Sequence, residues 1–204
     1  MLNRAKTNRI VVASRNKGKL IEIKEMLKDT DIEVVSVDDF YGIPRLVEDG
    51  QTFEENALCK ARAISQILNM TALADDSGLE VDFLKGLPGV KSARFAGEHA
   101  NDEENNKKLL RLLEGVPFED RKARFRCVIA MVCSDGREYK TEGFCDGYIT
   151  LEPRGSNGFG YDPIFWIPEF NMTFGEMEPG IKNNISHRAK ALSEMVKIIK
   201  REII

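Results

Sequence analysis

Residues 123–134 read ARFRCVIAMVCS and residues 137–150 read REYKTEGFCDGYIT, and these two stretches decide the fold class. Both alternate apolar with polar residues over much of their length, which is typical of strands. Asp135 and Gly136 lie between them and form a two-residue hairpin signal. Because a long antiparallel hairpin does not fit a purely parallel sheet, the sequence predicts a sheet of mixed strand directions.

Upstream of this hairpin, short apolar runs alternate with helical patterns. Thr52 and Glu55 have the T-x-x-E spacing of a capping box, and Ser186 is placed to cap the last helix. The expected strands are 9–14, 32–37, 71–75, 78–84 and 164–167, and the expected helices are 17–29, 53–68, 102–113 and 189–203. The chain is therefore expected to be α/β, with a mixed twisted sheet, flanking helices and a single domain over residues 1–204.

Composition excludes several classes of protein. Apolar residues make up 42% of the 204 and charged residues 31%, which suits a globular protein with a core. The net charge of −3 argues against a nucleic-acid partner but permits an anionic substrate. No run approaches the roughly 18 apolar residues of a membrane span, so no membrane partner is expected. Residues 1–14 lack a secretory apolar region, so a cytoplasmic location is expected. The four cysteines show no C-x-x-C spacing, which favours reduced, partly buried thiols over zinc.

Two segments offer groups for phosphate and metal. SRNKGK at 14–19 connects an expected strand to an expected helix, where backbone N–H groups suit an anion, although the Walker A spacing is absent. ADDSG at 74–78 places Asp75 beside Asp76, and neighbouring carboxylates repel unless a cation such as Mg²⁺ compensates. Their side chains would point to opposite faces of a strand, so one is expected to reach a shared site. The alternative for 14–19 is a polar loop without a ligand, and the alternative for 74–78 is a solvated turn.

Two further segments offer groups for a flat ring. GFGYDP at 158–163 places two aromatic residues around a glycine, and the alternative is a packed loop. SHRAKA at 186–191 opens the last helix with His187 and Arg188, which are hydrogen-bond donors suited to a ring carbonyl. The alternative there is an exposed, capped helix start. Taken together, the four segments supply the parts that bind a nucleoside triphosphate.

Five blocks carry a resemblance that covers about residues 9–195. In chain order they are SRNKGKLIEI, DGQTFEENALCKA, ADDSGLEVDFLKGLPGVKSARFAG, GFGYDPIF and SHRAKAL. The sequence resembles the inosine triphosphate pyrophosphatase family, whose bacterial members are dITP/XTP pyrophosphatases. The resemblance implies two lobes around a central cleft, a homodimer, and Mg²⁺-dependent hydrolysis of ITP, dITP and XTP to the monophosphate and pyrophosphate.

The resemblance also implies a role for each matched residue. Asp76 would accept a proton and, with Glu48, bind Mg²⁺. The other implied substrate contacts are Ser14, Arg15, Asn16, Lys17, Gly18, Lys19 and Lys60 for the phosphates, Ser77, the nucleoside loop Phe159, Gly160, Tyr161 and Asp162, and the base and ribose end Lys182, His187 and Arg188. Ser14 and Arg15 replace the family's usual Thr and Gly, and Lys91 stands where bacterial relatives often have an aromatic residue.

Chemistry agrees with these roles. Phosphoryl transfer needs charge neutralisation and alignment more than covalent help. Hypoxanthine and xanthine have a 6-oxo group that can accept hydrogen bonds from His187 and Arg188, whereas adenine presents a donor at that position. Guanine also has the 6-oxo group. Its 2-amino group must therefore be what excludes it. The rival interpretations are a pyrophosphatase for modified pyrimidine or methylated guanine nucleotides, a non-catalytic nucleotide sensor, and a nucleic-acid-binding module.

Overall fold

The computed structural model describes residues 8–44 and 46–203, which form two compact units. Unit 1 contains the chain up to Asp76, Val128–Thr141 and the chain from Ala191 onward, and unit 2 contains Ser77–Cys127 and Glu142–Lys190. Of residues 1–14, which were predicted to lack a secretory apolar region, residues 1–7 lie outside the described residues. Each unit is assembled from separated segments, so residues far apart in sequence build each one.

The strands form a seven-stranded sheet in the order β2-β1-β3-β4-β5-β6-β7. They are β1 Asn8–Val12, β2 Ile32–Ser36, β3 Thr71–Val81, β4 Lys122–Val132, β5 Glu138–Ile149, β6 Phe165–Ile167 and β7 Met172–Thr173. β1 is parallel to β2 and β3, whereas β6 is antiparallel to β5 and β7. The predicted mixed α/β sheet is confirmed.

Five α-helices accompany these strands in the described residues: α1 Lys17–Leu27, α2 Phe53–Leu68, α3 Asp102–Leu112, α4 Pro179–Ile185 and α5 His187–Glu202. The capping box at Thr52 and Glu55 is present, and the Ser186 hydroxyl accepts a hydrogen bond from the Ala189 amide at 3.1 Å, as predicted. α4 was not predicted, because its sequence PGIKNNI is short and has no helical apolar period.

The β4–β5 hairpin is confirmed, but its predicted two-residue turn is wrong. The loop between the strands covers residues 133–137, and the Cys133 amide donates to the Arg137 carbonyl at 2.8 Å. Within the loop the Asp135 carboxylate accepts from the Arg137 amide at 3.0 Å, and Gly136 has a left-handed φ of +89°. These contacts lengthen the turn, and glycine allows the positive φ.

Strand β3 runs without interruption through ADDSG, where the sequence predicted a strand end. The prediction rested on the repulsion between adjacent carboxylates, which was expected to need a cation such as Mg²⁺ at the end of the strand. Both Asp75 and Asp76 are instead buried and hydrogen-bonded or ion-paired to side chains on neighbouring helices. Because their charges are compensated inside the unit, the strand continues.

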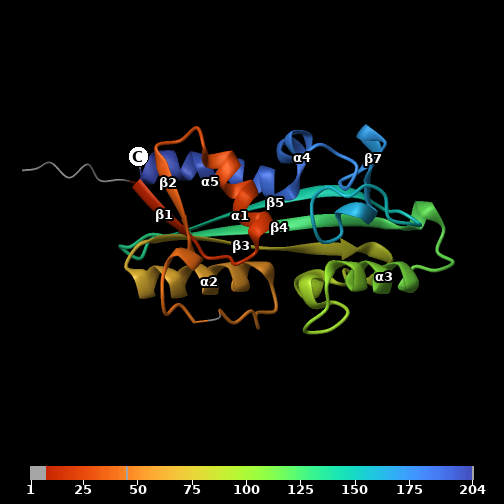
Figure 1. Cartoon of the computed structure of the whole chain (residues 1–204), viewed down its shortest axis with the longest axis horizontal. Helices are drawn as coiled ribbons and strands as arrows, with labels where there is room; N and C mark the ends of the chain where they lie inside the picture. Colours follow the sequence, from red (N-terminus) through yellow and green to blue (C-terminus); the bar gives the residue numbers. More distant parts are fainter. Residues whose placement is uncertain (1–7, 45, 204) are drawn as a thin grey trace, which may run out of the picture. The chain divides into compact units, whose positions relative to one another are not determined.

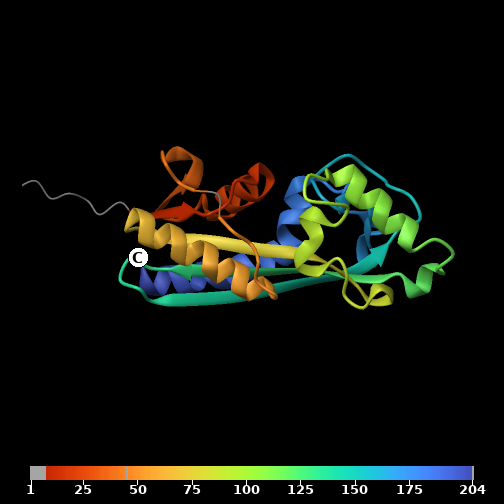
Figure 2. The same ribbon diagram turned by 90° about the horizontal axis from the view of Figure 1, so that it is seen from below.

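In unit 1, α2 and α5 cover opposite faces of the sheet (Figures 1 and 2). Strand β5 shows this by alternation. Glu138 and Lys140 form ion pairs with Arg62 and Glu54 of α2. Tyr139 and Thr141 alternate with these two residues along the strand. The Tyr139 hydroxyl donates to Glu202 at 2.8 Å and the Thr141 hydroxyl donates to the Ala191 carbonyl at 2.8 Å, and both acceptors belong to α5. Successive side chains of a strand point to opposite faces, so each helix covers one face.

Unit 2 has a core of its own, in which aromatic rings from three elements meet. Phe125 of β4 packs edge-on against Phe165 of β6 with ring centroids 4.6 Å apart, and Phe174 stacks on Phe125 at 5.9 Å. Leu109 of α3 is fully buried in the same cluster. α3 is therefore fixed to the sheet by apolar packing.

Three of the four cysteines are buried and Cys59 is exposed, so the prediction of partly buried thiols holds for Cys127, Cys133 and Cys145 only. The described cysteines are free thiols, and no group of three His, Cys, Asp or Glu side chains within residues 8–44 and 46–203 is placed to hold a metal alone. In the same part of the chain, no helix combines the length and apolarity that crossing a membrane requires.

Candidate active site

The loop SRNKGK lies between β1 and α1 in unit 1, as predicted. Asn16 is the N-cap of α1, and its side chain accepts from the Lys19 amide at 3.1 Å. The exposed Arg15 donates to the Ile43 carbonyl at 2.8 Å and pairs with Asp38, so its own unit already holds it. Of the remaining cations, Lys17 is exposed, whereas Lys19 reaches Asp75 at 3.0 Å. The helix start and Lys19 therefore form the part of this loop suited to an anion.

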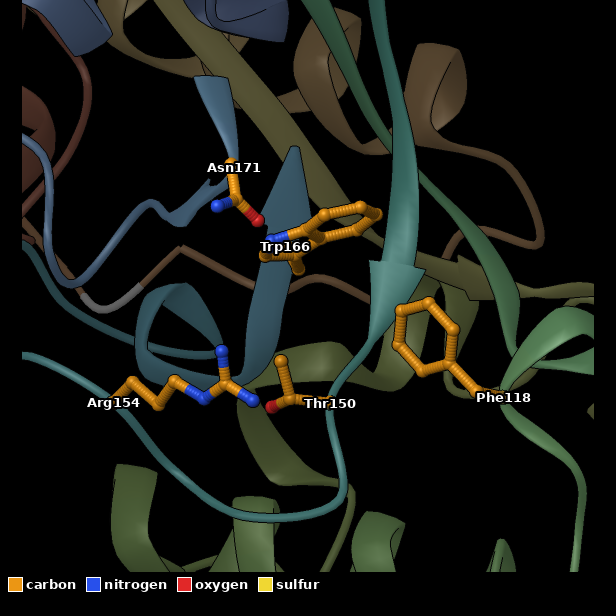
Figure 3. Close-up of a pocket in the computed structure, with 5 residues that line it drawn as sticks. All are labelled: Phe118, Thr150, Arg154, Trp166 and Asn171. Atoms are coloured by element: carbon orange, nitrogen blue, oxygen red, sulfur yellow. The ribbon is translucent and has the colours of Figure 1, made fainter. Parts of the chain in front are cut away.

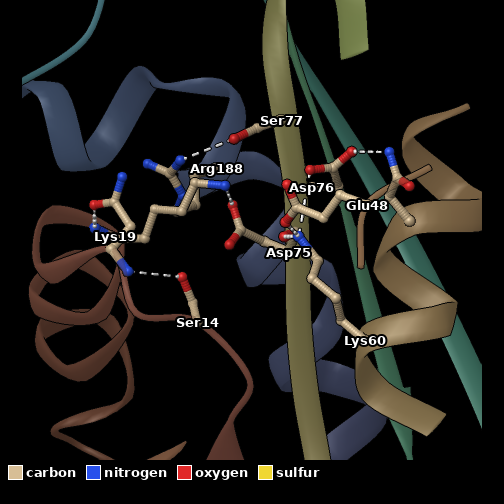
Figure 4. Close-up of polar contacts among 10 residues, drawn as sticks. Ser14, Lys19, Glu48, Lys60, Asp75, Asp76, Ser77 and Arg188 are labelled. Atoms are coloured by element: carbon tan, nitrogen blue, oxygen red, sulfur yellow. Dashed lines mark hydrogen bonds and ion pairs between the residues drawn. The ribbon is translucent and has the colours of Figure 1, made fainter. Parts of the chain in front are cut away.

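Lys60 is the centre of a polar cluster in unit 1. Its ammonium donates to Glu48 at 2.6 Å, to the Asp75 carbonyl at 2.8 Å and to Asp76 at 3.3 Å (Figure 4). The Lys60 side chain is only 5% exposed, so three oxygens replace the water that it would otherwise bind. The Asp75 carboxylate pairs with Lys19 of α1, whereas Lys60 contacts the backbone carbonyl of Asp75. This agrees with the prediction that one carboxylate of the pair reaches a shared site.

Asn56 completes this cluster and was missed by the sequence analysis. Its side-chain amide donates to Asp76 Oδ2 at 3.0 Å, while its carbonyl oxygen accepts from the Gly50 amide at 2.8 Å. One buried side chain thus links Asp76 to the loop that carries Glu48. The signal was available, because Asn56 and Lys60 are four residues apart and share a face of α2.

The cluster has an excess of negative charge, with three carboxylates (Glu48, Asp75, Asp76) and two ammonium groups (Lys19, Lys60). Burial raises the pKa of the Asp76 carboxyl above its ordinary value, and the charges of Lys60 and Lys19 oppose this rise. Burial by itself would lower the pKa of Lys60, but Asp76, Glu48 and Asp75 together raise it. Lys60 therefore stays charged, and Asp76 holds a proton more readily than an exposed carboxyl.

The donor set at Glu48 and Asp76 fits a hard cation. Both side chains offer carboxylate oxygens, Asp76 is buried, and Glu48 is 37% exposed and so open to solvent. Mg²⁺ in proteins is commonly held by one or two carboxylates plus substrate phosphates, which is consistent with two protein ligands here. The predicted roles of Glu48 and Asp76 are thus compatible with the geometry.

A second cluster lies in unit 2, around the buried pair Asp162 and Lys182. The Lys182 ammonium donates to Asp162 Oδ2 at 2.7 Å, and the same oxygen accepts from the Phe159 amide at 2.8 Å. The ring of Phe159 is half-buried and has two cations over it, with Lys182 Nζ 4.9 Å and the Arg188 guanidinium 5.5 Å from its centroid. The loop 158–163 and the helices α4 and α5 are thereby held together.

His187 and Arg188 are buried, so the alternative of an exposed helix start is wrong for them. The His187 ring stacks on Phe125 with centroids 4.6 Å apart and planes at 11°. Arg188 donates to the Ser77 hydroxyl at 3.1 Å (Figure 4). Both side chains are therefore held by neighbours within unit 2, and the Arg188 guanidinium lies over the Phe159 ring.

Tyr161 takes a different place from its predicted neighbours in the nucleoside loop. It belongs to the core of unit 2, and its hydroxyl donates to the Ser92 carbonyl at 2.8 Å. Burial raises the pKa of this phenol. Of the two aromatic residues in the loop, Phe159 therefore remains the one placed to meet a flat ring.

Two residues of α3, both missed by the sequence analysis, hold the loop at Gly160. Asp102 accepts from the Gly160 amide at 2.7 Å, and the Asn106 side chain donates to the Gly160 carbonyl at 3.0 Å. They are four residues apart and share a helix face. Since loop contacts of this kind depend on tertiary placement, only the i, i+4 spacing of two polar residues could have suggested them.

We expect Gly158→Ala to damage this loop far more than Gly160→Ala. Both glycines have a positive φ, +76° and +63°, so both substitutions meet a backbone cost of about 1–2 kcal/mol. A Cβ at Gly158 would lie 1.9 Å from Asp162 Oδ2, whereas a Cβ at Gly160 meets nothing within 4 Å. Gly158→Ala should therefore lower the free energy of unfolding by at least about 2 kcal/mol more, because it displaces the carboxylate that pairs with Lys182.

Urea denaturation of the two variants, followed by circular dichroism, measures this difference. Gly160→Ala is the matched control, since it carries the same strain without the collision. Equal destabilisation of the two variants would show that the Asp162 pair is not what the glycine protects.

Comparisons with known proteins agree with the fold. The Ham1 family model matches residues 10–198. A protein from Desulforamulus reducens, named dITP/XTP pyrophosphatase, is 53% identical over 193 residues, which is 95% of this chain and 96% of that protein. Among solved structures, a HAM1 protein from Coxiella burnetii aligns with a TM-score of 0.86 at 42% identity, covering 95% of this chain and 98% of that one. A nucleoside-triphosphatase / dITP/XTP pyrophosphatase from Mycobacterium abscessus aligns with a TM-score of 0.75 at 42% identity, covering 92% and 98%.

Proposed function

This chain belongs to the Ham1 family, and from that premise we propose that it is a dITP/XTP pyrophosphatase. The reaction would take a nonstandard purine nucleoside triphosphate, such as ITP, dITP or XTP, and water to the monophosphate and pyrophosphate. The observation that carries the proposal is the buried Lys60 ammonium, which binds Glu48 and Asp76 together. These charged groups suit the binding of a phosphate chain and a water molecule. A structural role alone would not require this arrangement.

We propose that Asp76 accepts the proton of the attacking water. Its raised pKa, caused first by burial, makes it a stronger base than an exposed carboxylate once it is ionised. Asn56 and Lys60 fix the two carboxylate oxygens, so the group is oriented before substrate arrives. Lys60, together with Lys19 at the start of α1, would offset the negative charge of the phosphates.

Glu48 and Asp76 are the residues that would hold Mg²⁺. When bound, the ion supplies neutralisation of phosphate charge. The exposure of Glu48 supports this assignment, because that carboxylate can exchange its contact with Lys60 for a cation and phosphate oxygens. Asp75 is ion-paired to Lys19 and is assigned to the support of the site rather than to the metal.

The base would be recognised by the second cluster. Arg188 and Lys182 are buried donors beside the Phe159 ring, and the 6-oxo group of hypoxanthine or xanthine is an acceptor. Adenine presents an amino donor at that position, which cannot accept a hydrogen bond from these side chains, and a mismatch of this kind costs about 10⁴-fold in comparable sites. His187, stacked on Phe125, is expected to contribute a ring nitrogen to the same edge.

The experiment that tests the function is pyrophosphate release from ITP, XTP, dITP, ATP, GTP and dTTP, with and without Mg²⁺. We expect turnover of ITP, dITP and XTP that requires Mg²⁺, with ATP nearly inert. Turnover of pyrimidine nucleotides would keep the hydrolytic half of the proposal and overturn the base recognition. Nucleotide binding without turnover would identify a sensor instead.

We also propose that the protein acts in the cytoplasm as a homodimer without a nucleic-acid partner. The net charge of −3 supports the last point, since general nucleic-acid binders are basic. Sedimentation velocity across a range of protein concentrations tests the dimer. Electrophoretic retardation of DNA that weakens with salt would contradict the expected absence of a nucleic-acid partner.

A further inference from the structure

Unit 2 contains a pocket of about 280 Å³ that uses none of the residues assigned to the substrate (Figure 3). Its walls come from the turn before β4, the end of β5, the following loop, β6, and the residue before β7. The lining residues are Phe118, Thr150, Arg154, Trp166 and Asn171. The volume is close to the lower end of small-molecule sites, roughly 300 Å³.

One side of the pocket is aromatic. Phe118 stacks on Tyr148 with ring centroids 5.4 Å apart, and it meets Trp166 edge-to-face at 5.5 Å. These contacts fix the rings in position, yet Phe118 is still 39% exposed. A fixed and partly exposed aromatic surface suits a flat ring, because stacking on it requires little ordering of the protein.

The polar residues of the pocket are anchored by their backbones rather than by their side chains. The Arg154 amide donates to the Pro163 carbonyl at 2.8 Å, and the Arg154 carbonyl accepts from Thr173 at 2.9 Å. The Asn171 amide donates to the Pro168 carbonyl at 3.1 Å. Within the described part of the chain, the Arg154 guanidinium, the Asn171 side-chain amide and the Trp166 indole N–H have no hydrogen-bond or ion-pair partner. Three sets of hydrogen-bonding groups are therefore available to a ligand.

A second guanidinium, that of Arg121, bonds one of the residues that line the pocket. The fully buried Arg121 donates to the Thr150 carbonyl at 2.8 Å and to the Leu113 carbonyl at 3.0 Å. Among residues 8–44 and 46–203, no carboxylate pairs with Arg121 or Arg154. The Thr150 hydroxyl is also fixed, since it donates to the Glu152 carbonyl at 2.7 Å. Two guanidinium groups near one rigid wall favour an anion.

We propose that this pocket binds a nucleoside monophosphate, with the base against Phe118 and Trp166 and the phosphate at Arg154. The guanidinium matches a phosphate because it donates two parallel hydrogen bonds. The Asn171 amide supplies both a donor and an acceptor, which suits a base edge or a ribose hydroxyl. The binding inference does not depend on the proposed hydrolysis, although that reaction would release a ligand of this class.

Trp166 is the only tryptophan of the chain, so the fluorescence signal arises at this pocket. Titration of the full chain with inosine monophosphate is expected to quench Trp166 in a saturable way. Arg154→Gln should weaken this binding about tenfold, the loss expected for a charged hydrogen-bonded contact. The control, Asp162→Ala combined with Lys182→Met, alters the substrate cluster without leaving a buried charge unpaired, and it should leave the quenching constant unchanged.

Isothermal calorimetry on the same variants keeps the test independent of the fluorescence. Inorganic phosphate and uridine monophosphate serve as further probes, which separate anion binding from stacking. Quenching by phosphate alone with equal affinity, or equal weakening by the Asp162→Ala/Lys182→Met control, would overturn the inference. So would a Trp166 signal that follows protein concentration instead of ligand, since a second copy would then occupy the pocket. An enzyme inactive in the pyrophosphate assay yet quenched normally would refute only the proposed function.

Discussion

Replacement of Asp76 by Asn should reduce pyrophosphate release from ITP by about 10³-fold, the range expected for loss of a general base. The amide keeps the size of the side chain and a hydrogen-bond acceptor for Lys60, so the fold is expected to survive. It removes the proton acceptor and one of the two carboxylates assigned to Mg²⁺. The loss should appear in kcat at saturating Mg²⁺ and substrate.

The adjacent residue supplies the control for this prediction. Asp75→Asn makes the same change of charge one position earlier on β3. The Asp75 carboxylate pairs with Lys19, whereas Lys60 contacts only the backbone carbonyl of Asp75. We expect that variant to lose stability but to keep activity within roughly tenfold of the parent, an effect about the size of one charged hydrogen bond. Full turnover by Asp76→Asn, or an equal loss in both variants, would refute the assignment of Asp76 as the base.

The second large effect is expected at the buried pair in unit 2. Asp162→Ala removes the acceptor of the Lys182 ammonium, whose side chain is only 6% exposed, and leaves that charge buried without its carboxylate. Breaking a buried pair in this way costs about 3–5 kcal/mol of unfolding free energy. Urea denaturation followed by circular dichroism measures the loss.

A double variant distinguishes the effect of the unpaired buried charge from the effect of the altered loop 158–163. Asp162→Ala combined with Lys182→Met removes both members of the pair, so much of the lost stability should return. Binding of ITP should not return, because the Phe159 amide has lost its acceptor and the base end has lost a cation. A double variant as unstable as the single one would show that the buried charge is not the cause.

The mixed sheet could be predicted from sequence because its signals are local. The β4–β5 hairpin follows from two long strand patterns joined at Asp135 and Gly136, and the start of α2 follows from its capping box. The continuity of β3 could not be predicted, because it depends on Lys19 and Lys60 reaching Asp75 and Asp76 from helices elsewhere in the chain. Local reasoning sees two repelling carboxylates, and only the tertiary structure provides their partners.

The candidate site, too, could be predicted only in part from the sequence. Sequence blocks identified the residue types of both clusters, and the geometry brings Glu48, Lys60 and Asp76 together as expected. Burial was the part that sequence reasoning missed. Tyr161 is a core residue rather than a platform, and Asn56 holds Asp76 although no short motif marked it. Whether a polar residue of a helix faces solvent or a cluster depends on what packs against it, which one sequence does not state.

The division of unit 1 into three chain segments has a consequence for biosynthesis. Its last segment begins at Ala191, so this part of α5 reaches β5 only after residues 1–190 have been synthesised. Until then, one face of β5 is uncovered. This is the face on which Tyr139 bonds Glu202 and Thr141 bonds Ala191. Domains fold as units during synthesis and exposed apolar faces aggregate. A nascent chain stalled before Ala191 would thus carry the residues of both clusters on an incomplete unit 1 and would be prone to aggregation.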